Sequence, residues 1–261
     1  MPFAKGTIPF ILKVARQKKP DWLERNREDY EALVLNPLKE LAGELRRTAG
    51  ESAPGYHFPQ KGIGRLKRSA PSRENSGSIY KGWVSYSASR PSGSRFDHNP
   101  SLFFMINPDD SEGDEVLLAG GLYMPSSRQL RAIREAIARN AAPFEELFSS
   151  KLFNARFSGG FCLERISKRV PRGFDPQHER IGWLKLQGYF VWRSYKLKQF
   201  TSRGFARLVA ADALQLLRLN ELLDQAISGR WRGLPEECAV QVEGLSTRLG
   251  EMDSPRRRMD F

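Results

Sequence analysis

The order of its short β-type segments constrains the fold of this chain most. Four such segments, rich in β-branched or aromatic residues, follow one another at 63–69, 79–87, 102–106 and 115–123. The polar turns between them, 71–78, 90–100 and 107–114, are too short for the crossover that parallel strands need. The sequence therefore predicts an antiparallel meander.

Helical patterns lie on both sides of this strand-rich centre. Before it we expect a helix over 7–18 capped by Thr7, a second from Asp21, and a third from Pro37 to Gly50. After it we expect helices from about 126 and 143, a strand near 161–163, a short helix over 177–184, a strand over 188–195, and a long helix over 201–228 capped by Thr201. This order predicts an α+β fold with a central, largely antiparallel sheet, helices packed on it, N-terminal helices and a long C-terminal helix.

The domain organisation follows from length and composition. A chain of 261 residues favours one domain with appendages. Residues 229–261 are rich in proline, glycine and charge, so we expect a single domain over 1–228 and a loosely attached tail over 229–261.

Positive charge is concentrated in two internal segments. The net charge is +12, from 42 Lys and Arg against 30 Asp and Glu. Residues 51–100 hold eight basic and three acidic residues, residues 164–198 hold nine and three, and an acidic stretch lies at 109–115. If the two basic segments lie side by side, they form one surface for phosphates, nucleic acid or an acidic partner. The alternative is a solvated face coated with lysine and arginine.

The compartment is predicted from two simple features. Two cysteines, Cys162 and Cys238, without a CxxC motif indicate a reducing compartment, so we expect a cytoplasmic protein. No apolar run approaches the roughly 20 residues of a membrane span, so we expect no membrane partner. The basic N-terminus is transit-peptide-like in composition but lacks serine, and we interpret it as an ordinary first helix.

Several blocks of the sequence resemble a known family. They are Trp22-Leu-Glu-Arg-Asn-Arg-Glu-Asp-Tyr30, Gly120-Gly-Leu-Tyr-Met-Pro125, and Pro171-Arg-Gly-Phe-Asp-Pro176 with His178 and Leu184-Lys-Leu186. Their order and spacing resemble the bacterial family called domain of unknown function 2461, over roughly residues 5–228. The resemblance implies that the N-terminal helix belongs to the domain, and it implies no reaction.

The family signature is Arg-x-x-Arg-Asp-x-Arg-Phe, then an acid or amide with Lys, then Tyr. Arg65, Arg68 and Tyr80 match it, and Lys81 follows. The positions between them depart from it: Ser69 replaces Asp, Pro71 and Ser72 replace Arg-Phe, and Ser76 and Gly77 replace the acid-or-amide and Lys pair. The resemblance thus implies that any family activity carried by those side chains is lost or altered here.

The signature arginines form a candidate anion site. On a strand, Arg65 and Lys67 share one face and Arg68 takes the other. Arginine forks bind carboxylates and phosphates through two hydrogen bonds. The alternative is that these cations pair with the acidic 109–115 stretch or with helix carboxylates.

Other candidates have structural alternatives. Gly120 and Gly121, ahead of a helix, are able to present amides to an anion, but close strand packing is the favoured interpretation. His178 follows a turn in which Asp175 can act as a cap, and a role as a general base is the alternative. Cys162 fits a buried, inert thiol better than a nucleophile. The three histidines are scattered, and no spacing predicts a metal site or a cofactor.

These features favour a protein that binds an anionic, phosphate-bearing small ligand in a basic cleft, whether or not it performs chemistry. The residues expected to bind are Arg65, Arg68, Tyr80 and Lys81, with Gly120, Gly121 and His178 as neighbours. The first alternative is a nucleic-acid-binding module that uses 61–81 and 164–198, where aromatic and basic residues alternate through 188–200. The second alternative is a protein-interaction domain without catalysis.

Overall fold

An antiparallel sheet forms the centre of the computed structural model, which describes residues 3–61, 63–92, 97–108, 115–157 and 159–232. The strands are β1 (Val84–Ser89), β2 (Ser101–Ile106), β3 (Val116–Leu122) and β4 (Tyr189–Ser194). They pair in the order β1-β2-β3-β4, each antiparallel to the next. The predicted α+β class and antiparallel sheet are confirmed.

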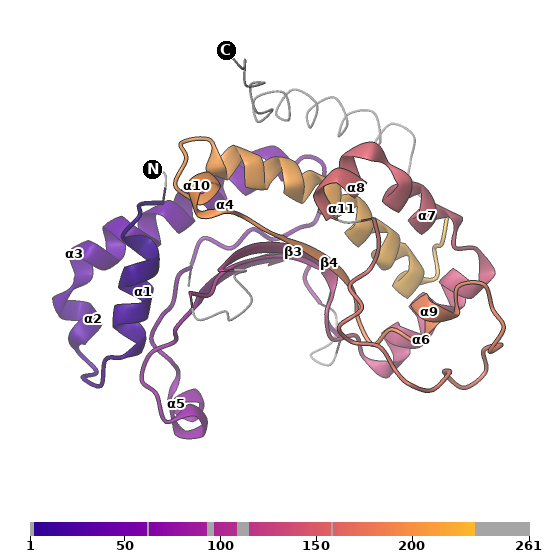
Figure 1. The fold of residues 1–261 in the computed structure, drawn as a ribbon, viewed down its shortest axis with the longest axis horizontal. Helices are drawn as coiled ribbons and strands as arrows, with labels where there is room; N and C mark the ends of the chain where they lie inside the picture. The colour runs from indigo at the N-terminus through magenta and orange to yellow at the C-terminus, as the bar shows by residue number, and fades with distance from the viewer. Residues whose placement is uncertain (1–2, 62, 93–96, 109–114, 158, 233–261) are drawn as a thin grey trace, which may run out of the picture.

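Helices cover one face of this sheet. In chain order the helical elements are α1 (Thr7–Ala15), α2 (Trp22–Arg25), α3 (Arg27–Tyr30), the π-helix η1 (Glu31–Leu35), α4 (Asn36–Ala49), α5 (Ala70–Ser76), α6 (Ser127–Arg139), α7 (Ala142–Ser149), α8 (Lys151–Phe157), α9 (Ile181–Leu184), α10 (Leu197–Phe200) and α11 (Phe205–Ser228). Figure 1 shows α4, α10 and α11 above the arched sheet, α1 to α3 at one end of the molecule, and α6 and α9 at the other. The inner side of the arch faces away from α11.

The strands alternate between these two sides. Tyr86, Phe104 and Leu118 are cross-strand partners that are buried on the helix side. The next row, Ser87, Phe103, Ala119 and Trp192, points to the inner side and is half-buried or exposed. An antiparallel sheet with one buried face produces this alternation.

Two glycines allow the sheet to pack this tightly. A Cβ atom on Gly120 would lie 2.6 Å from the Cβ of Leu216, so glycine lets α11 settle against β3. Gly121 has φ +119°, and a Cβ there would lie 2.3 Å from the carbonyl oxygen of Tyr189 on β4. Packing alone therefore requires glycine at both positions.

A buried carboxylate joins α11 to its neighbours. Asp212 is fully buried, and it accepts hydrogen bonds from Tyr195 Oη at 2.7 Å and Arg193 Nη1 at 3.0 Å. Arg156 of α8 also pairs with it. Burial raises the pKa of Tyr195, and the neighbouring carboxylate raises it further. Breaking one partner of such a buried pair is costly, so this network fixes β4 and α8 on α11.

The N-terminal helices differ from the prediction in an informative way. Pro37 does not restart the chain, because the helix runs from α3 through η1 into α4. Proline cannot donate to the carbonyl four residues earlier, which is that of Leu33. Thr7 does not cap α1, whose N-cap is Gly6; its hydroxyl donates to the Leu33 oxygen instead, at 2.7 Å.

Four other local predictions are wrong. The predicted turn over 71–78 contains α5, and the predicted strand over 63–69 reduces to one bridge between Lys67 and Tyr80. No strand forms over 161–163, where the Cys162 amide makes a single bond to the Phe190 oxygen. Thr201 does not cap α11, which begins at Phe205 after an N-cap at Gly204. The proposed boundary at 228 stays a prediction, since 233–261 lie outside the described residues.

Within the described residues, no helix is both long enough and apolar enough to cross a bilayer.

Candidate functional site

A short hairpin brings the signature residues together. The Arg68 amide donates to the Ile79 oxygen at 2.9 Å, and the Lys81 amide donates to the Leu66 oxygen at 2.8 Å. The loop of the hairpin contains α5, which begins after Ser69 with proline in its first turn and ends at Gly77 with φ +64°. This pairing places the start of the signature beside its end.

Arg65, Arg68 and Lys81 form a group of like charges, which we call the cation cluster. The pKa of Lys81 lies below its ordinary value, because partial burial disfavours the ammonium and because Arg68 and Arg65 repel it. The Lys81 Nζ lies 4.4 Å from the centre of the Trp83 ring, which gives it a cation–π contact. In the part of the chain that the structure describes, no carboxylate forms an ion pair with any of the three.

Lys67 belongs to the same hairpin but is not part of the cation cluster, because its charge is paired with a carboxylate. Its Nζ lies 3.4 Å from Glu24 Oε1, so its charge is used within the fold. The strand alternation expected for 63–69 does not form, and both Arg65 and Arg68 act electrostatically on Lys81. The acidic residues 109–114, an alternative partner for these cations, lie outside the described residues.

Tyr80, which precedes Lys81, is a buried residue that holds the hairpin in place. It is 1% exposed, and its hydroxyl accepts the Leu23 amide at 3.3 Å and donates to the Pro20 oxygen at 2.9 Å. The carbonyl of Tyr80 accepts from Arg68 Nε at 3.3 Å and from the Ser78 hydroxyl at 2.8 Å. These contacts fasten the hairpin to the segment between α1 and α2.

The other predicted site residues lie elsewhere. Gly120 and Gly121 are within β3. The helix that follows them, α6, has a complete capping box of Ser126 and Gln129. The Asp97 carboxylate also accepts a hydrogen bond from the Ser126 hydroxyl, so a negative group is already present at that helix end.

His178 lies in the loop before α9. Its Nδ1 accepts the Arg180 amide at 3.0 Å, and its Nε2 lies 3.4 Å from the Ala138 oxygen. Asp175 accepts the Gln177 amide at 2.8 Å and so closes the turn rather than capping the helix. Both contacts of the imidazole ring are with backbone, as expected for a residue that stabilises a turn.

The parts of the two basic segments around α5 and α9 do not lie side by side. Figure 1 shows α5 at the end of the molecule that holds α1 and α2, whereas α9 and the loop before it lie at the opposite end. Several cations of 164–198 are also engaged: Arg180 pairs with Glu145, Arg193 with Asp212, and Arg165 donates to the Tyr123 oxygen at 2.7 Å.

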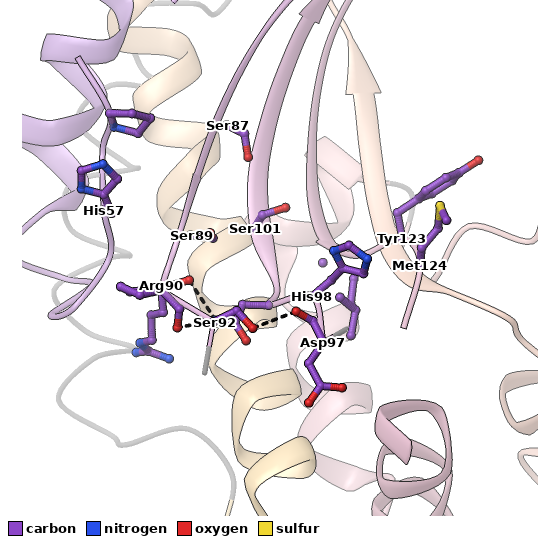
Figure 2. Close-up of a pocket in the computed structure, with 15 residues that line it drawn as sticks. His57, Ser87, Ser89, Arg90, Ser92, Asp97, His98, Ser101, Tyr123 and Met124 are labelled. Carbon is purple, nitrogen blue, oxygen red and sulfur yellow. Dashed lines mark hydrogen bonds between the residues drawn. The ribbon is translucent and has the colours of Figure 1, made fainter. Parts of the chain in front are cut away.

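A pocket of about 610 Å³ lies at the other end of β1 from the cation cluster. Figure 2 shows His57 and His98 on opposite sides of it, with Ser87 and Ser101 between them. Of the predicted site residues, only Gly121 lines it. Sequence spacing does not indicate this site, because His57 and His98 are 41 positions apart. The small residues Ser89, Ser101 and Gly121, which become cross-strand neighbours, are a signal for it.

The remaining candidates offer little chemistry. Burial is the main cause that raises the pKa of the half-buried Cys162, which disfavours a nucleophilic thiolate. Among the residues with described positions, no three His, Cys, Asp or Glu side chains gather as metal ligands.

Comparison with known proteins defines the class to which the chain belongs. The family model described as a conserved hypothetical protein (DUF2461) matches residues 6–221. The chain is therefore a member of the family called domain of unknown function 2461, as its sequence blocks predicted. No curated protein and no solved structure matches it.

Proposed function

We propose that this protein binds an anionic, phosphate-bearing small ligand at the cation cluster. The proposal rests on one observation: Arg65, Arg68 and Lys81 lie close together, and among the described residues no carboxylate forms an ion pair with them. Burial and the two arginines lower the pKa of Lys81. Tyr80 contributes by holding the hairpin in place. Gly120, Gly121 and His178 are not part of this site.

The physical reason is electrostatic. Like charges that are held close together raise each other's free energy, and more so where one of them is partly buried. A bound anion replaces that repulsion with attraction, and arginine forks add paired hydrogen bonds to its oxygens. Ser69 stands where the family signature has Asp, so this chain has no acid directly after Arg68 to neutralise the cluster.

Isothermal titration with inorganic pyrophosphate tests the proposal. We expect Lys81→Met and Arg68→Ala each to weaken binding by about tenfold or more, which corresponds to the loss of one charge-assisted contact. Lys67→Met is the matched control: it removes one positive charge from the same hairpin, but that charge is already paired with Glu24. Equal affinity in all four proteins contradicts the proposal.

Nucleic-acid binding is the second candidate, and the inner face of the sheet favours it. Trp192 and Phe103 are only partly buried there, and exposed aromatic rings are the stacking platforms of single-strand binders. Gel-shift assays with single- and double-stranded DNA and RNA at low and raised salt decide it. Binding that falls steeply with salt supports this candidate, and no binding at low salt removes it.

The cytoplasm is the proposed compartment, because Cys162 is a free thiol and the chain carries only two cysteines. A protein-interaction role is a third candidate, which a stoichiometric partner in a pull-down supports.

A further inference from the structure

The pocket at the end of β1 has a floor of small side chains. Ser89, Ser101 and Gly121 are successive cross-strand partners on the inner face of the sheet. The same row ends at Phe190 on β4, which is 6% exposed and packs against Tyr123 at 5.0 Å between ring centres. Small residues beside a large aromatic pair leave a hollow on an otherwise regular sheet.

Five polar side chains that line this hollow have no hydrogen-bond partner among the described residues. They are Ser87, Ser89, Ser101, His57 and His98. Their backbones are fixed: the His57 amide bonds to the Ser89 oxygen at 2.8 Å, and Gln129 Nε2 donates to the His98 oxygen at 2.5 Å. Hydroxyl groups and imidazole rings both donate and accept, so this set matches ligand groups that do the same.

The two formally charged residues of the pocket are already neutralised. Arg90 pairs with Glu221 at 2.9 Å and with Asp224, both on α11. Asp97 pairs with Arg128 and accepts the Ser126 hydroxyl at 2.7 Å; these hydrogen bonds lower its pKa, so it keeps its negative charge. A pocket with compensated charges and an ionised carboxylate in its wall favours an uncharged ligand over an anion.

One side of the pocket is apolar. Tyr123 and Met124 line it and are 54% and 56% exposed, whereas Leu122 is 2% exposed and contributes little surface. The volume of about 610 Å³ lies within the range of small-molecule sites. The pocket thus offers hydrogen-bonding groups on its floor and flanks and a hydrophobic wall beside them.

We propose that this pocket binds an uncharged ring that carries several hydroxyl groups, the chemistry of a hexose or a glycoside. The hydroxyls bond to the serines and imidazoles, and the apolar face of the ring packs against Tyr123 and Met124. The site is independent of the cation cluster, because β1 separates the two by roughly 17 Å, given five residue steps of about 3.4 Å.

Saturation-transfer NMR tests this with methyl β-D-glucopyranoside, methyl β-D-galactopyranoside and glucose 6-phosphate. All measurements use Lys81→Met protein, so that the cation cluster does not contribute. At about 10 mM ligand, which reports millimolar dissociation constants, we expect at least one methyl glycoside to receive saturation. We expect glucose 6-phosphate to bind at least about threefold more weakly than that glycoside.

Ser101→Leu fills the floor and is expected to abolish the signal. Ser85→Leu is the matched control, because Ser85 is a half-buried serine on the same face of β1 outside the pocket. The double variant His57→Ala, His98→Ala changes two exposed loop residues and decides the question if Ser101→Leu does not fold. No glycoside signal, stronger binding of glucose 6-phosphate, or a signal that survives in the folded pocket variants overturns the proposal.

Discussion

The hydroxyl of Thr7 donates a 2.7 Å hydrogen bond to the carbonyl oxygen of Leu33. Pro37, four residues after Leu33, has no amide proton to give that carbonyl, and the helix widens into the π-helix Glu31–Leu35 just before it. Thr7 is fully buried, and Leu33 is half-buried, so this hydrogen bond lies at the edge of the core. A side chain of α1 thus completes the long helix that ends in α4.

Thr7→Val is expected to lower the free energy of unfolding by about 1–2 kcal/mol, because it removes a hydrogen bond from a fully buried side chain to the half-buried carbonyl of Leu33. Thr7→Ser keeps the hydroxyl and loses one methyl group, so it should cost about 1 kcal/mol. Urea denaturation measures both. If serine is as damaging as valine, the hydrogen bond is not what holds α1.

Lys81→Met tests the repulsion within the cation cluster. Because Arg68 and Arg65 repel Lys81, removing this charge should leave the unliganded protein as stable or more stable, by up to about 1 kcal/mol at low salt. The gain should shrink in high salt, where exposed charges are screened. Thermal unfolding at two salt concentrations measures it, and a clear loss of stability at low salt would mean that the cluster holds a counter-charge of its own.

Gly121→Ala should destabilise the fold by about 3 kcal/mol or more, because φ is +119° and the new Cβ meets the Tyr189 oxygen. Gly77→Ala is the matched control. Its φ is also positive, at +64°, but nothing lies within 4 Å of the new Cβ, so the cost should be about 1 kcal/mol. Similar costs at both positions contradict the close approach of β4.

The raised pKa of Asp224 should make the free energy of unfolding depend on pH. Burial raises its pKa to about 6, since the attraction of Arg90 does not offset desolvation and the repulsion of Glu221. Between its ordinary pKa and about 6 the folded chain holds a proton that the unfolded chain releases, so this group destabilises the fold as pH rises through that window. The difference in unfolding free energy between wild type and Asp224→Asn should therefore change by about 1–3 kcal/mol from pH 4 to 7, in favour of the variant. Parallel pH curves contradict this assignment.

The antiparallel order of β1, β2 and β3 was predictable because its signals are local, whereas the pairing of β4 with β3 joins segments more than sixty residues apart. Short polar turns force antiparallel neighbours, and β3 and β4 were predicted to within two residues at each end. The helix caps predicted at Thr7 and Thr201 are wrong, because the Thr7 hydroxyl bonds to the distant Leu33 oxygen and the Thr201 hydroxyl bonds back to the Leu197 oxygen four residues earlier. Nothing local indicates that the carbonyl of Leu33 needs the hydroxyl of Thr7.

For the candidate sites too, features that lie close together in sequence were predictable and tertiary contacts were not. Sequence spacing placed Arg65, Arg68 and Lys81 in one motif, and the hairpin brings them together. Sequence did not indicate that Tyr80 is buried beneath them, nor that α5 fills the turn. The pocket is hard to infer from sequence, because its two histidines come from loops 41 positions apart and line opposite sides of one hollow only after the strands pair.

The pKa of Lys81 itself tests the central claim most directly. NMR titration of the Lys81 side chain, labelled with ¹³C at Cε and assigned with Lys81→Met, measures it with and without pyrophosphate. We predict a pKa below that of an ordinary lysine in the free protein, and a clear rise when pyrophosphate binds. A pKa that pyrophosphate leaves unchanged at saturating concentrations would contradict anion binding at the cation cluster.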